Sequence, residues 1–133
     1  MGAVYSVRLV LAFDDRNAVT EKLKECLRML IKGEHARFSI DESKIEHMDL
    51  IGTVNAFLPD ILENEKYQVL LYDANHFTCT SGFDASYGWE TILAIMFTYV
   101  APVLRDGSMI TVEPDNESWT MVVKDGVAID IDK

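Results

Sequence analysis

The chain opens with a long apolar run and then changes to a helical pattern. Residues 4–13 (VYSVRLVLAF) are aliphatic and β-branched, with Arg8 as their only charge, which predicts a central strand. The next apolar positions recur at helical spacing: Val19, Leu23, Cys26, Leu27 and Leu30. The polar run at residues 14–17 supplies N-cap side chains, and Gly33 ends this predicted helix. Residues 35–40 alternate between apolar and polar, so the first forty residues predict β-α-β.

The middle of the chain continues this alternation of elements. Residues 42–62 suit a helical stripe, in which Gly52 and Pro59 favour a break or a second short helix. Residues 67–72 (YQVLLY) predict a buried strand, and extended character continues after the turn that follows it. Residues 89–104 give the strongest helical pattern of the chain, with a wide apolar face. We expect this helix to pack across the sheet as the main core element.

The C-terminal part predicts three strands at residues 109–113, 118–124 and 127–131. The last two are joined by Asp125-Gly126, a strong hairpin signal. Taken together, the patterns predict a single α+β domain over residues 1–133. Its sheet is largely antiparallel, its helices pack on one face, and a three-strand meander ends the chain.

Charge is unevenly distributed along the 133 residues. The formal net charge is −10, and residues 67–133 contribute most of it, with 10 acids against three bases. Such a surface repels nucleic acid and anionic membrane and attracts basic partners, so we expect neither direct nucleic-acid binding nor membrane binding. No secretion signal opens the chain, and Cys26 and Cys79 do not form an evident disulfide framework, which predicts free thiols and a cytoplasmic protein.

Two surfaces are candidates for function. The first is an acidic C-terminal face that would dock a basic partner. Trp119 lies within this acidic stretch, where core packing is its favoured role and an aromatic anchor for the partner is the alternative. Alternation separates Val127, Ile129 and Ile131 from Asp130 and Asp132 on the last strand. The predicted partner-binding residues are Glu113, Asp115, Glu117, Trp119, Asp130 and Asp132.

The second candidate is the loop predicted at residues 81–88, which leads into the strongest helix. Its candidate residues are Phe83, Asp84, Ser86 and Tyr87. Small residues before a helix can hold an anion, but the chain has no glycine-rich phosphate motif, and Asp84 would repel a phosphate. Capping of the helix by Asp84 or Ser86 is the simpler interpretation.

No residue pattern predicts a catalytic centre, a metal site or a cofactor. His76 and Cys79 are three positions apart on a predicted strand and would point to opposite faces. The sequence therefore favours a small acidic cytosolic binding or inhibitor protein that docks on a basic macromolecule, such as a nucleic-acid-binding protein. By analogy alone, small acidic inhibitors from phages and mobile elements have this character. Two alternatives stay open: a small enzyme with a pocket near residues 81–89, and an adaptor or oligomer subunit.

Overall fold

The computed structural model describes residues 2–33, 42–58, 67–86, 88–114 and 118–131. Its strands are β1 (Gly2–Ala12), β2 (Gln68–Tyr72), β3 (His76–Ser86), β4 (Met109–Pro114), β5 (Trp119–Lys124) and β6 (Val127–Asp130). Its helices are α1 (Arg16–Lys32), α2 (Leu50–Phe57) and α3 (Trp89–Val100), with 3₁₀ turns η1 (Glu42–His47) and η2 (Ala101–Val103). The predicted strand at residues 35–40 lies outside the described residues.

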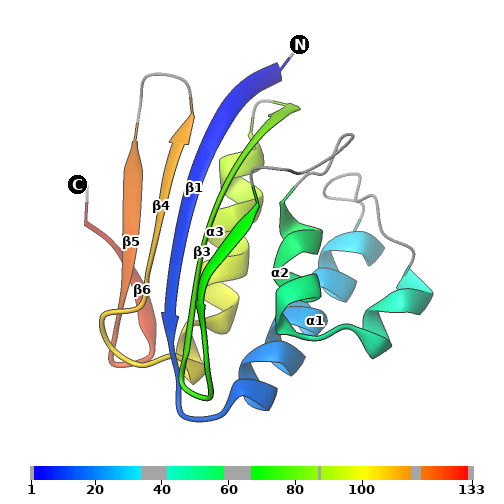
Figure 1. Cartoon of the computed structure of the whole chain (residues 1–133). Helices are drawn as coiled ribbons and strands as arrows, with labels where there is room; N and C mark the ends of the chain where they lie inside the picture. Colours follow the sequence, from blue (N-terminus) through cyan, green and yellow to red (C-terminus); the bar gives the residue numbers. More distant parts are fainter. Residues whose placement is uncertain (1, 34–41, 59–66, 87, 115–117, 132–133) are drawn as a thin grey trace.

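One antiparallel sheet of six strands organises the fold. Its order is β2-β3-β1-β4-β5-β6, so β1 pairs on both sides, as expected for a central strand. The described helices lie on one side of this sheet (Figure 1). The other side is called the open face below. This arrangement confirms the predicted α+β class with helices on one face and a C-terminal β4-β5-β6 run.

Alternation along β1 fixes which side of the sheet is the core. Tyr5, Val7, Leu9 and Leu11 are buried against the helices, whereas Ser6 and Arg8 are exposed on the open face. From α3, the buried side chains are Trp89, Ile92, Leu93, Met96, Phe97 and Val100. As expected, this helix turns a wide apolar face into the core. Near Pro102 it tightens into η2, because proline cannot continue the helical hydrogen bonding.

Helix ends follow the predicted caps at α1. The Asp15 carboxylate accepts hydrogen bonds from the backbone N–H groups of Asn17 and Ala18, and the N–H of Gly33 donates to the carbonyl of Met29. The predicted second short helix is α2, which follows η1. Gly52 lies inside α2 and does not break it, because the interruption falls before Asp49, which caps α2 by accepting from the Gly52 N–H. Pro59 lies outside the described residues.

Two local predictions were wrong. Residues 68–72 of the run YQVLLY form β2, which is an exposed edge strand instead of a buried one. The segment predicted as a loop is the second half of β3, which pairs with β1 as far as Ser86. The Asp125-Gly126 hairpin is confirmed: it joins β5 to β6 with φ values of 52° and 76°, the left-handed geometry that tight hairpin turns require.

Candidate interaction surface

A row of mainly apolar side chains crosses the open face from one edge of the sheet to the other. The row follows the strand register at consecutive paired positions: Leu71, Thr78, Val10, Met109, Val122 and Ile129. We call it the apolar row. It takes one residue from each of the six strands, so it forms a continuous stripe perpendicular to the strands.

The ends of the apolar row are well exposed. Leu71 is 47% exposed and Ile129 is 43% exposed. On β6 and just beyond it, Val127 (58%) and Ile131 (54%) share the face of Ile129. Scattered exposed apolar residues are ordinary on a protein surface, but a contiguous apolar patch typically marks a contact with another molecule.

A polar row runs beside the apolar row, and it has the positions Gln68, Thr80, Arg8, Thr111 and Thr120. The hydroxyls of Thr111 and Thr120 are 3.2 Å apart and share a hydrogen bond. Arg8 is exposed near the middle of the sheet, and no side chain that the structure describes forms an ion pair with it. The open face thus combines an apolar stripe with a central cation.

The structure divides the acidic residues that the sequence grouped on one surface. Glu113 is exposed on the open face, opposite Ser6. Asp130 pairs with Met121 on the helix side and is half-buried there. The prediction that these two carboxylates share one face was therefore wrong. Because α3 and η2 pack beside β6, Ala128 and Asp130 face the helices, and Ile129 faces the open side. Asp115, Glu117 and Asp132 lie outside the described residues.

Trp119 also lies on the helix side. It pairs with Val112 on β4 and packs, partly buried, against the core. This placement fits the core-packing interpretation of Trp119 better than a role as an anchor on the open face. Its predicted role in partner binding stays a prediction.

The second candidate segment contributes to the core and the sheet instead of forming a loop. Phe83 is buried and stacks on Tyr5, with ring centroids 5.3 Å apart. Asp84 and Ser86 belong to β3, and Tyr87 lies outside the described residues. Gly88, with a φ of 97°, is the N-cap residue of α3, so neither Asp84 nor Ser86 occupies the N-cap position that the sequence suggested for it.

A partly buried polar pair lies where this segment meets α3. The Tyr5 hydroxyl donates a hydrogen bond of 2.6 Å to Oε2 of Glu90. Burial, followed by the neighbouring Glu90 carboxylate, raises the pKa of Tyr5 to about 12. At neutral pH the phenol is therefore a fixed donor, which suits a structural contact and not a general base.

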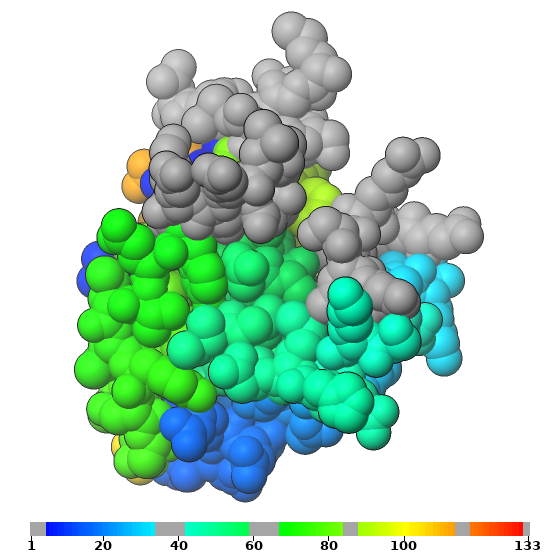
Figure 2. All heavy atoms as spheres, turned by 45° about the vertical axis from the view of Figure 1, so that its right-hand side comes forward, coloured from blue at the N-terminus to red at the C-terminus, as the bar shows by residue number. Residues whose placement is uncertain are grey.

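A polar pocket of about 500 Å³ opens between α1, the start of α2 and β2, on the side of the molecule shown in Figure 2. Its wall includes Lys24, a buried side chain that donates to the Glu46 carbonyl at 3.0 Å and pairs with Glu21 at 3.3 Å. The Arg16 guanidinium lies 5.1 Å from the ring centre of Tyr72. The full lining is Arg16, Asn17, Thr20, Glu21, Lys24, Met48, Asp49, Leu50 and Tyr72. It holds two bases and two acids, a balance that selects no ligand charge.

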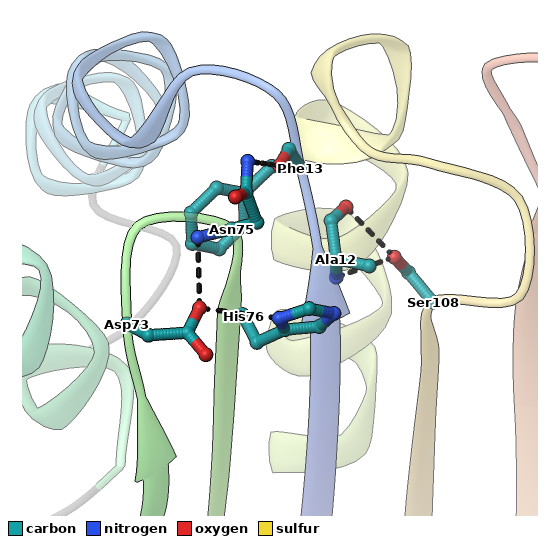
Figure 3. Close-up of polar contacts among 6 residues, drawn as sticks. All are labelled: Ala12, Phe13, Asp73, Asn75, His76 and Ser108. Carbon is teal, nitrogen blue, oxygen red and sulfur yellow. Dashed lines mark hydrogen bonds and ion pairs between the residues drawn. The ribbon is translucent and has the colours of Figure 1, made fainter.

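Asp73, His76 and Ser108 gather near one end of the sheet, but they do not form a catalytic triad (Figure 3). His76 Nδ1 lies 3.1 Å from Asp73 Oδ1, whereas the Ser108 hydroxyl is buried and bonded to the backbone N–H and carbonyl of Ala12 at 2.9 and 3.2 Å. No hydrogen bond joins His76 to Ser108, although the structure describes both. A hydrogen bond from the Asn75 N–H, and then His76, lower the pKa of Asp73. These contacts hold the turn between β2 and β3 and the end of β1 in place, which is a structural role.

Neither the thiols nor the residue types that bind metals form a candidate reactive site among the described residues. Cys26 and Cys79 are free and buried, and loss of solvation raises the pKa of each to about 12. Exposed His76 and buried Cys79 lie on opposite faces of β3, as predicted. Within the described ranges, no three His, Cys, Asp or Glu side chains come together in a group that could hold a metal ion.

Comparison with known proteins adds no family. No family model, no curated protein and no solved structure matches this chain. None of the helices in the described ranges is long and apolar enough to cross a bilayer. The apolar row of the open face, which sequence reasoning missed, is therefore the feature from which a function can be argued.

Proposed function

We propose that this protein is a protein-binding module that docks its partner on the open face of its sheet. The observation that supports this most directly is the apolar row, which crosses all six strands without a described element covering it. Removing apolar surface from water gains roughly 25 cal/mol per Å² of free energy, so covering the apolar row favours binding of a partner.

The surroundings of the apolar row define the chemistry of the partner. Antiparallel sheets with one solvated face normally carry polar residues there, as the neighbouring row of threonines does. A flat apolar surface on the partner would match the row, and a carboxylate would match the guanidinium of Arg8. The partner that fits best is thus another flat protein surface with at least one acidic side chain.

A basic partner in the cytoplasm, which the sequence predicts, stays a prediction. The formal charge of −10 supports long-range attraction of such a partner. The open face itself does not select it, since Arg8 and Lys124 stand there against Glu113 among the described side chains. A basic partner would be recognised by binding that weakens as the Debye length falls from ~10 Å at 0.1 M salt to ~3 Å at 1 M.

The test compares matched variants in binding to a purified partner. Val122→Lys places a charge in the middle of the apolar row, and Met29→Lys makes the same kind of change on α1, where Met29 is 42% exposed. Proteins that bind the parent but do not bind Val122→Lys are then purified. Calorimetry measures their affinity for the parent and for both variants. We expect binding to the parent and to Met29→Lys, and at least tenfold weaker binding to Val122→Lys. Equal binding to all three would show that the open face is not the docking surface.

A further inference from the structure

We infer that the partner on the open face is a second copy of this chain, so that two sheets pack face to face in a homodimer. The inference rests on the proposed function of that face and names its occupant. Three features of the described residues carry it: the position of the apolar row in the sheet, the charges beside the row, and the size of the face.

The position of the apolar row in the sheet allows the row of one copy to lie over the row of a second copy. In the order β2-β3-β1-β4-β5-β6, the middle of the sheet falls between β1 and β4. A twofold axis along the strands at this point sets β1 over β4 of the second copy, and β2 over its β6. Val10 then meets Met109 of the second copy, and Leu71 meets its Ile129. Twisted sheets pack in this aligned manner at about 30°.

The charges on the open face are complementary under the same axis. Arg8 lies over Thr111 of the second copy, and Glu113 of that copy is two residues further along the same strand. This offset is ~6.6–6.8 Å, which the long arginine side chain can span. The twofold repeats the contact, so Arg8 and Glu113 form two pairs across the interface.

The face is also large enough for a reversible dimer. Five strand spacings of ~4.8 Å give a width of about 24 Å, and seven residues at ~3.3 Å, from Ser6 to Ala12, give a length of about 23 Å. The footprint is therefore about 550 Å² per copy, or about 1,100 Å² in total, which clears the roughly 1,000 Å² expected of a specific interface. An interface of this size predicts a dimer whose population depends on protein concentration.

Sedimentation equilibrium of the full chain tests the inference. We expect the mass to rise with concentration from 15.0 kDa towards twice that value. Val122→Lys should stay monomeric. Ile129→Lys should also stay monomeric, and because Ile129 is exposed on an edge strand, this second variant disturbs folding less. Met29→Lys is the matched control and should dimerise like the parent. Circular dichroism confirms that each variant is folded.

Exchange of the two charges adds a readout that loss of folding cannot imitate. Arg8→Glu should weaken the dimer at least tenfold, and Arg8→Glu combined with Glu113→Arg should restore it. A parent that stays monomeric up to about 1 mM overturns the inference, because weaker association falls outside specific interfaces. A dimer that Val122→Lys and Ile129→Lys both leave intact overturns it as well.

The inference and the proposed function fail in different ways. If the chain is monomeric but a purified partner binds the parent and not Val122→Lys, the docking face stands and its occupant is a different protein. If neither self-association nor partner binding responds to Val122→Lys, the open face has no docking role.

Discussion

The side chain of Asn75, in the turn between β2 and β3, donates a hydrogen bond of 3.0 Å to the backbone carbonyl of Phe13 at the end of β1. The Phe13 N–H in turn donates to the carbonyl of Asn75 at 2.9 Å. Because β2 is an edge strand with exposed side chains, this pair of hydrogen bonds ties its hairpin to the central strand and helps to hold the Leu71 end of the apolar row in register.

Replacement of Asn75 by Ala should destabilise the protein by about 1 kcal/mol, since one intramolecular hydrogen bond contributes 0.5–1.5 kcal/mol and the Phe13 carbonyl loses a partner. Urea unfolding measures the change. Asn17→Ala is the matched control, because Asn17 is exposed and its side chain makes no hydrogen bond in the described structure. Equal losses for the two variants would mean that the Asn75–Phe13 contact is not stabilising.

Long sequence patterns predicted the fold well. The run around Leu9 identified the central strand, the stripe from Trp89 to Phe97 identified the core helix, and Asp125-Gly126 identified the last hairpin. Each of these patterns depends only on residues within one helix, one strand or one turn. The class and the C-terminal strand run followed from them.

Position within the sheet was harder to predict, because it depends on pairing between distant segments. The run at residues 68–72 is as apolar as β1, yet it forms an edge. Ser81-Gly82 suggested a loop, although Phe77, Cys79, Ser81 and Phe83 alternate into the core and gave a usable signal for a longer strand. The apolar row needs the register of five strand pairs, including the irregularity between Val69 and Leu71, and no local pattern contains that information.

The two cysteines should resist thiol reagents in the folded protein. Cys26 and Cys79 are buried, and the pKa of each thiol is raised to about 12, so neither the thiolate nor access for a reagent is available at pH 8. Alkylation followed by mass spectrometry should find both unmodified in buffer and both modified in denaturant. Rapid modification of one thiol in buffer would contradict its burial.

Trp89 links α3 to α2 through its indole. Its Nε1–H donates to the Phe57 carbonyl at 3.0 Å in a buried position. Trp89→Phe keeps most of the apolar surface and should cost about 1–3 kcal/mol by leaving that carbonyl without the indole donor. Trp89→Ala should cost about 3–5 kcal/mol, since it also opens a cavity. Chemical denaturation of both variants tests this order, and an equal loss would assign the whole effect to the hydrogen bond.

Alkaline pH should weaken the protein through Tyr5. Its pKa is about 12 when folded against 10.0 for an ordinary tyrosine, so above pH 10 the unfolded chain releases this proton first. The stabilisation from the Tyr5 phenol is therefore fully present below pH 10 and is lost as the pH rises towards 12.

Comparison with Tyr5→Phe isolates this effect, because the other titrating groups are common to both proteins. At pH 8 the variant should be less stable by about 2 kcal/mol, as it lacks a hydrogen bond to the charged Glu90 carboxylate. At pH 11 we expect this difference to shrink by about 1 kcal/mol, since the phenol in the unfolded chain is then largely ionised. Urea unfolding at both pH values measures it. A difference that stays constant between pH 8 and pH 11 would show that Tyr5 titrates alike in the folded and unfolded states, and the raised pKa would be refuted.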